Sequence, residues 1–153
     1  HTVGSSALGR MMIRYFKKQG IKLISIVRKQ QYVDELLKDG ADHVLNSSSE
    51  TFEKDLKELA EKEKATICFE AVGGEFTGKV LRNMPNGSTS YVYGSMSGSP
   101  QINADIGDLI FKGKQIKGFW LNEQFQRKPE EVQKMFGEIM GNLAGALSTK
   151  VQK

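Results

Sequence analysis

The first residues of the chain carry a pattern that could bind a phosphate group. The stretch GSSALG places Gly4, Ser6 and Gly9 at the spacing of a GxGxxG dinucleotide-binding turn, with serine at the middle position. In such a turn the first glycine allows a tight bend, and the last lets the following helix pack close to its strand. Free N–H groups at the start of the helix then bind a pyrophosphate. The serine is a tolerable departure, because a small hydroxyl side chain can itself donate a hydrogen bond to phosphate.

The same serines support a second interpretation, in which Ser5 or Ser6 only caps a helix, as serine commonly does. The pattern alone does not separate the two, because the fingerprint is meaningful only between a strand and a helix of a βαβ unit. Only three residues, HTV, precede Gly4. We therefore expect the first strand of the sheet to be truncated.

Basic residues follow the next apolar run, KLISIV (22–27), and they indicate the type of cofactor. Roughly 20 residues beyond the first glycine, an NAD site places an acid on the ribose hydroxyls, whereas an NADP site places a basic residue on the 2′-phosphate. Here Arg28 and Lys29 end the run, and no acid occurs before Asp34. An Arg–phosphate contact contributes about 1.5–3 kcal/mol, which favours NADP. The alternative is that Arg28 is an ordinary surface residue.

Alternating segments along the rest of the chain would position these residues. Short apolar, β-branched runs predict strands, and amphipathic stretches that end at glycine predict helices. The predicted strands are 22–27, 42–46, 65–72, 88–94 and 115–121, and the predicted helices are 7–19, 31–39, 50–64, 76–84, 105–113 and 132–143. Apolar strands that alternate with helices belong to a parallel sheet covered on both faces. The sequence thus predicts a doubly wound α/β, Rossmann-like fold that binds ligands at the carboxyl ends of its strands.

Composition excludes several classes of protein. With 153 residues, 39% hydrophobic and 26% charged, the chain suits a single soluble domain. A single Cys cannot form an internal disulfide, and one Cys with two His supplies too few ligands for a structural zinc site. We therefore expect no bound metal. We also expect a reducing compartment, cytoplasmic or otherwise intracellular. No apolar run is long enough to cross a membrane, and no signal peptide begins the chain. The net charge is +4, but the Lys and Arg residues are mixed with acidic residues along the chain, as in EKDLKELAEKEK. This mixture disfavours nucleic-acid binding.

Six segments together resemble the cofactor-binding domain of the medium-chain dehydrogenase/reductases, specifically the zinc-independent quinone oxidoreductases and trans-2-enoyl reductases. They are GSSALGR (4–10), ISIVRK (24–29), LLKDGADHVLN (36–46), FEAVGG (69–74), VYGSMSG (92–98) and DLIFKGKQIKGFWL (108–121). The resemblance covers nearly all of the chain, and the order and spacing of the segments make it specific.

The resemblance implies a cofactor role for the end of each strand. The implied contacts are Gly4, Ser5, Ser6, Ala7, Leu8 and Gly9 at the pyrophosphate, Arg28 at the 2′-phosphate, Ala71 and Val72 beside the adenosine and ribose, Tyr93 and Gly94 near the nicotinamide ribose, and Phe119, Trp120 and Leu121 at the nicotinamide amide. For each of these residues the alternative is a purely structural role. FEAV and GFWL are also typical of buried strands, and Trp120 is also typical of a hydrophobic core. Cys68 is interpreted as an inert core residue.

The resemblance also implies an NADPH-dependent oxidoreductase that transfers hydride to an activated alkene, a quinone or an enoyl thioester. Members carry a separate GroES-like catalytic domain, so we expect residues 1–153 to be the dinucleotide-binding domain of a longer chain whose missing part holds the small-molecule substrate. Alone, this domain is expected to bind NADPH weakly and to turn over nothing. No catalytic acid or base is assigned, although Tyr15, Tyr32, Tyr91 and Tyr93 are available. A homodimer through the edge strand 115–121 is common in the resembling family; the alternative is that the last helix covers this strand.

Two other functions are alternatives to this one. A nucleotide-sensing or structural module would keep the fold without redox chemistry, and Ser6 and the short first strand favour it. A methyltransferase that uses S-adenosylmethionine fits poorly, because such sites usually place an acid where this chain has Arg28 and Lys29.

Overall fold

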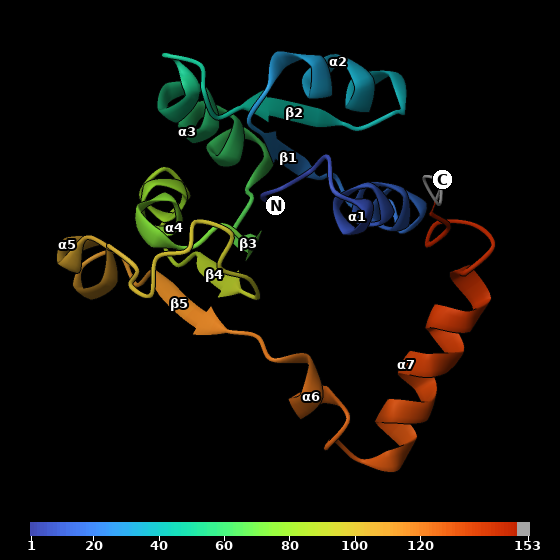
Figure 1. Cartoon of the computed structure of the whole chain (residues 1–153). Helices are drawn as coiled ribbons and strands as arrows, with labels where there is room; N and C mark the ends of the chain where they lie inside the picture. Colours follow the sequence, from blue (N-terminus) through green and yellow to red (C-terminus); the bar gives the residue numbers. More distant parts are fainter. Residues whose placement is uncertain (150–153) are drawn as a thin grey trace.

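The computed structural model describes residues 1–149 as strands and helices that alternate along the chain (Figure 1). The strands are β1 (Ile24–Val27), β2 (His43–Asn46), β3 (Ile67–Glu70), β4 (Thr89–Val92) and β5 (Gln115–Gly118). The helices are α1 (Ala7–Lys18), α2 (Gln30–Lys38), α3 (Phe52–Glu63), α4 (Gly74–Arg82), α5 (Ile106–Ile110), α6 (Leu121–Gln124) and α7 (Pro129–Asn142). The predicted order is confirmed, but every strand is shorter than predicted and α6 was not expected.

All of the strand pairs are parallel, and they form two groups, β1–β2 and β3–β4–β5. Residues 1–4, which we call the central segment, lie between the groups. On one side Ile26 N donates to His1 O (2.8 Å), and Gly4 N donates to Ile26 O (3.0 Å). On the other side Thr2 N donates to Phe69 O (3.0 Å). The central segment therefore bridges the two groups by hydrogen bonds, at the position where the sequence predicts a short first strand, and we refer to the two groups together as one sheet.

Helices cover both faces of this sheet. Successive side chains of a strand point to opposite faces, so β1 contributes to a core on each side. Ile24 and Ile26 face a core built mainly with α3 and α4, whose other buried members are Phe52, Leu56, Ala60, Cys68, Val80, Leu81 and Met84. Val27 faces a second core with α1 and α2, whose other members are Ile13, Val33, Leu36 and Ala41. The doubly wound α/β prediction is thereby confirmed.

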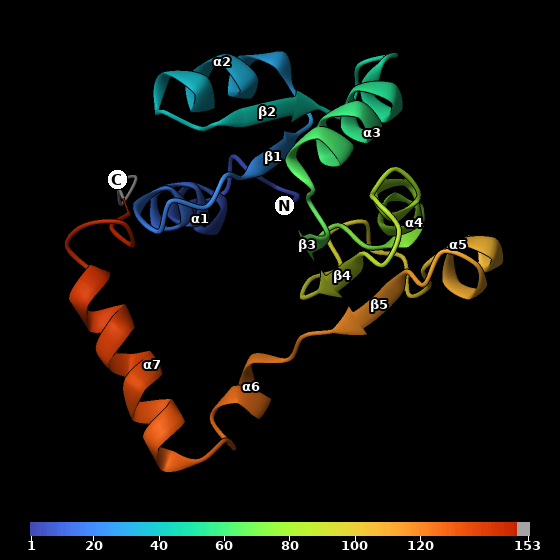
Figure 2. The same cartoon turned by 180° about the vertical axis from the view of Figure 1, so that it is seen from behind.

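The last helix, α7, is attached to α1 through polar contacts. Lys18 Nζ donates to Asn142 Oδ1 (2.8 Å), Arg14 Nε donates to Ala146 O (3.0 Å), and the Tyr15 hydroxyl bonds Glu138. Both views show α7 standing away from β3, β4 and β5 (Figures 1 and 2). The alternative in which the last helix covers β5 therefore does not describe this structure.

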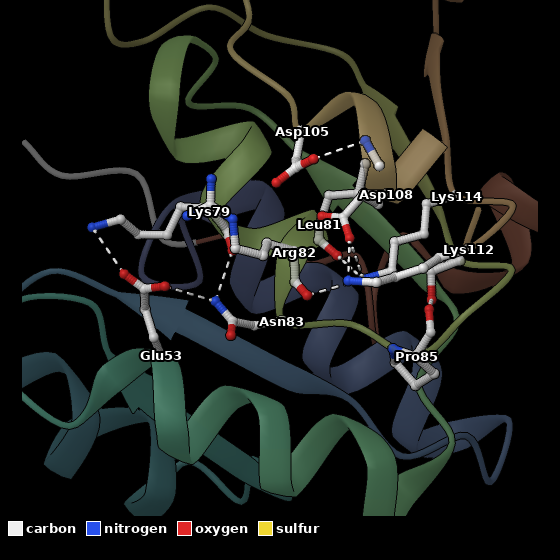
Figure 3. Close-up of polar contacts among 12 residues, drawn as sticks. Glu53, Lys79, Leu81, Arg82, Asn83, Pro85, Asp105, Asp108, Lys112 and Lys114 are labelled. Carbon is white, nitrogen blue, oxygen red and sulfur yellow. Dashed lines mark hydrogen bonds and ion pairs between the residues drawn. The ribbon is translucent and has the colours of Figure 1, made fainter. Parts of the chain in front are cut away.

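A buried ion pair joins α4 and α5 at the end of the sheet where β5 begins (Figure 3). Lys114 Nζ donates to the carbonyls of Leu81 and Arg82 (2.9 Å each) and lies 3.7 Å from Asp108 Oδ1. Burial lowers the pKa of Lys114 although Asp108 opposes the shift. Burial alone would raise the pKa of Asp108, but the hydrogen bond from Lys112 and the charge of Lys114 outweigh it and lower that pKa. The pair thus stabilises the ionised form of Asp108, whereas burial destabilises the charged form of Lys114.

We predict that Lys114→Ala lowers the free energy of unfolding by about 3 kcal/mol, because it leaves Asp108 and two helix carbonyls without this partner. Lys112→Ala is the matched control. Its half-exposed side chain also bonds Asp108 (2.7 Å), and its loss should cost less than about 1 kcal/mol. Urea denaturation followed by circular dichroism measures both. Equal losses would show that burial of Lys114 does not matter.

Candidate functional site

The residues that the sequence analysis singled out lie at one edge of the sheet. Because all of the strands are parallel, their carboxyl ends meet there, and the candidate residues lie at or just after the end of a strand or of the central segment, some of them in the first turn of the next helix. Helices α1, α2 and α4 begin at this edge, so the positive ends of their dipoles point toward it.

The glycine turn joins the central segment to α1. Gly9 has no room for a side chain, and Gly4 has little. A Cβ on Gly9 would lie 2.5 Å from Gly4 O and 2.6 Å from Val3 O, and one on Gly4 would lie 3.1 Å from Ser25 Cβ. Val3 itself has φ +56°, a conformation that a β-branched residue rarely adopts. Such strain is concentrated at functional sites. The turn is therefore built for close approach of α1 to the sheet, as its two glycines predict.

Ser6 is the N-cap of α1, and its Oγ accepts a hydrogen bond from Gly9 N (3.0 Å). The capping interpretation is thus correct, but it does not exclude the other one. Within residues 1–149 the backbone N–H groups of Ala7 and Leu8 make no hydrogen bond, and both residues are exposed. Two outward donors at the positive end of a helix fit a diphosphate.

Arg28 directly follows β1, and its side chain is exposed. Among the described residues its guanidinium forms no hydrogen bond and no ion pair, whereas its carbonyl accepts from Ser48 Oγ (2.9 Å). Lys29 occupies the N-cap of α2 without a side-chain cap bond. A free guanidinium beside a free helix start is a suitable partner for a phosphate monoester.

The ends of β3 and β4 form one wall of the site. Tyr93 N donates to Glu70 O (2.9 Å), and a Cβ on Gly94 would lie 2.9 Å from Ala71 O, so these two strand ends are in direct contact. Val72 lies on the same wall, where its carbonyl accepts from Ser97 N (2.7 Å). Burial raises the pKa of Tyr93, so its hydroxyl stays protonated at neutral pH.

The end of β5 reaches this wall through only one of its three candidate residues. Phe119 N donates to Val92 O (2.8 Å), but Trp120 and Leu121 are 60% and 54% exposed where the chain turns away into α6. The alternative that Trp120 belongs to the core is wrong. Cys68, in contrast, is buried, which confirms it as a core residue, and the burial raises the pKa of its thiol.

Three buried residues at this edge were not predicted from the sequence: Thr2, Glu70 and Thr77. Their hydroxyl and carboxylate groups bond one another between the central segment, the end of β3 and α4. The only local signal was an acid at the end of an apolar run, directly before AVGG.

A hollow of about 880 Å³ lies along α1 and α2 and reaches the glycine turn at Ser5 and Ala7. Its arginines are already engaged. Arg10 pairs with Glu35 (2.8 Å) and Asp39 (2.6 Å), and Arg14 bonds carbonyls near the end of the described chain. The hollow therefore offers less free positive charge than the strand edge does.

The described residues offer neither a metal site nor a membrane-spanning helix. The part of the chain that the structure covers has no group of three His, Cys, Asp or Glu side chains placed to hold a metal ion. None of the helices assigned within residues 1–149 has the length and apolar character needed to cross a membrane.

We predict that Gly9→Ala destabilises the protein by about 2 kcal/mol, because the new methyl group collides with the backbone of the turn. Gly137→Ala in α7 is the matched control, since no atom lies within 4 Å of its Cβ position. That change should stabilise the protein by about 0.5–1 kcal/mol, the helix preference of alanine over glycine. Thermal unfolding of the two variants should shift in opposite directions. A shift of the same sign would contradict the tight turn.

Known proteins share both the sequence and the fold. Residues 7–139 match the model of the family described as "Zinc-binding dehydrogenase". The mitochondrial enoyl-[acyl-carrier-protein] reductase of Yarrowia lipolytica is 31% identical over 143 residues, which make up 89% of this chain and 38% of that protein. The chain thus spans about two fifths of the length of this relative.

Solved structures give the same picture. A proposed NADPH:quinone reductase from Mesorhizobium loti is 30% identical, with a TM-score of 0.86 over 99% of this chain and 44% of its own. Escherichia coli quinone oxidoreductase, solved with NADPH, has the same fold at 22% identity, with a TM-score of 0.83 over 99% of this chain and 46% of its own. The chain therefore belongs to the zinc-binding dehydrogenase family, in which its relatives are oxidoreductases of the enoyl reductase and quinone oxidoreductase kind.

Proposed function

We propose that the chain is the NADPH-binding part of an oxidoreductase that reduces an activated alkene, a quinone or an enoyl thioester. The observation that carries this proposal is the pairing of two kinds of free donor at one edge. The N–H groups of Ala7 and Leu8 suit a diphosphate, and the guanidinium of Arg28, which has no partner among residues 1–149, suits a further phosphate group.

The proposed work of the chain is binding and orientation. NADPH, when bound, supplies the hydride. The start of α1 holds the diphosphate, Arg28 holds the 2′-phosphate, and the wall of Ala71, Val72, Tyr93 and Gly94 limits where the ribose groups lie. Phe119, with Trp120 and Leu121 where the chain leaves the sheet, offers backbone groups to the nicotinamide amide. Tyr93 is half-buried in this wall, and we assign it no role as an acid or a base.

We propose further that this chain is one domain of a longer enzyme. It matches 38% of the Yarrowia lipolytica relative and 44% of the Mesorhizobium loti chain. A further domain would contribute the substrate pocket and the group that protonates the reduced substrate, so no residue of this chain is assigned as catalytic.

We predict that Arg28→Ala weakens NADPH binding about ten- to a hundredfold and leaves NADH binding unchanged, because only NADPH carries the 2′-phosphate. Two-dimensional NMR titration up to millimolar cofactor measures weak dissociation constants, and the amide signals of Ala7 and Leu8 report the diphosphate directly.

Arg127→Ala is the control for this measurement, since it removes an exposed arginine that pairs only with Glu131 (3.7 Å) among the described residues. It should leave both affinities unchanged. Equal affinity of the unchanged protein for NADPH and NADH would overturn the NADP assignment. Complete absence of binding to the sheet edge would favour a structural module.

We also propose that β5 forms a homodimer by pairing with β5 of a second copy. It is the edge strand of its group, and its exposed residues include Gln115, Lys117 and Gly118. Gln115 N and Phe119 N donate inward, to Ser88 O and Val92 O (2.8 Å each). In a strand the N–H groups alternate in direction, so Gly118 N points to the free edge.

We predict that Gly118→Pro gives a monomer, because proline removes a donor from the pairing edge. Gly118→Ala should stay dimeric, since the Cβ position has no neighbour within 4 Å. Sedimentation velocity over a concentration series measures the two masses. A monomeric unchanged protein, or a dimeric proline variant, would contradict pairing through β5.

A further inference from the structure

Glu70 is a fully buried carboxylate for which the proposed function has no use. Its Oε1 accepts hydrogen bonds from Val72 N (2.7 Å) and Thr2 Oγ1 (3.3 Å). Its Oε2 accepts from Gly73 N (2.9 Å) and Thr77 Oγ1 (2.5 Å). A buried charge is tolerated only where donors surround it. These donors come from three separate places: the central segment, the turn after β3, and α4.

Thr2 makes this cluster continuous with the glycine turn. Its hydroxyl donates to Glu70 and accepts a hydrogen bond from Ala71 N (2.9 Å), so both of its bonds go to the end of β3. Thr2 is also fully buried, and it stands two residues before Gly4. One network therefore fixes the start of the glycine turn and the turn 71–74 in relation to each other.

We propose that Glu70 is a positioning residue of the cofactor site, which with Thr2 holds the diphosphate-binding turn and the ribose wall at a fixed separation. This inference rests on the proposed function. Glu70 acts through Ala71, Val72 and the central segment, and it touches no cofactor itself. A ligand that spans both turns gains affinity when their separation is set before binding.

Both oxygens of Glu70 are needed as acceptors, because Val72 N bonds one and Gly73 N bonds the other, and an amide of the same shape cannot replace them. A glutamine has one oxygen and one NH₂ group, so one of its two ends would present hydrogens to donors. The threonine hydroxyls can rotate to accept, but the N–H groups of Val72 and Gly73 are fixed. One of these two backbone groups therefore loses its acceptor in Glu70→Gln, and the turn 71–74 has to shift.

The test compares Glu70→Gln with Asp108→Asn in NMR titrations with NADPH and with NADH. Both changes turn a buried carboxylate into an amide, but Asp108 lies at the opposite end of the sheet, next to Lys114 (Figure 3). We expect Glu70→Gln to weaken both cofactors at least fivefold and to keep their affinity ratio, because it acts on the part that the two share. Asp108→Asn should lower the unfolding temperature and leave both affinities unchanged.

A second pair keeps the inference testable if Glu70→Gln does not fold. Thr2→Ser preserves the hydroxyl and should keep wild-type affinity, whereas Thr2→Val removes it and should weaken both cofactors at least threefold. Wild-type affinity in folded Glu70→Gln or Thr2→Val would overturn the inference, as would an equal loss in Asp108→Asn. If Arg28→Ala changes the cofactor ratio while these variants bind normally, the proposed function stands and only this inference fails.

Discussion

The structure depends on the central segment, residues 1–4, which hydrogen-bonds to β1 on one side and to β3 on the other. The central segment contacts β1 through His1 and Gly4 and contacts β3 through Thr2, and without it the two groups of parallel strands would share no ladder among the described residues. The same segment leads directly into the glycine turn. The sheet and the candidate binding edge are therefore one arrangement, since whatever fixes the central segment also fixes where α1 begins. The buried hydroxyl of Thr2 extends this constraint from backbone to side chain.

The order of elements was predictable because it depends on local periodicity. Strand ends were less so, and β3 shows why. The apolar run suggested a strand over 65–72, but the strand ends at Glu70. The next N–H groups leave the ladder for side chains, because Ala71 N bonds Thr2 and the N–H groups of Val72 and Gly73 bond the Glu70 carboxylate. One of these acceptors, the Thr2 hydroxyl, lies 69 positions away in the chain, and no local pattern contains that information.

The candidate site divides in the same way. The glycine turn was predictable because its demand is steric and local: Gly9 allows no Cβ. Arg28 was identified by its position after a strand, and the structure adds that its guanidinium has no partner within the described chain. The positions of Trp120 and Leu121 were harder to predict, since the backbone leaves the sheet immediately after Phe119. Nothing in GFWL distinguishes a strand that continues from one that stops.

Ser6 shows how a departure from a motif can be compatible with its chemistry. A helix start has several unpaired N–H groups, and a capping side chain takes up only one or two of them. Ser6 bonds Gly9 N, the third residue of α1, so the donors of the first two residues stay free. The cap stabilises the helix by about 1 kcal/mol relative to alanine, and by about a few tenths of a kcal/mol relative to the glycine of the usual motif. The serine therefore makes the donors of Ala7 and Leu8 available in a helix that is already formed.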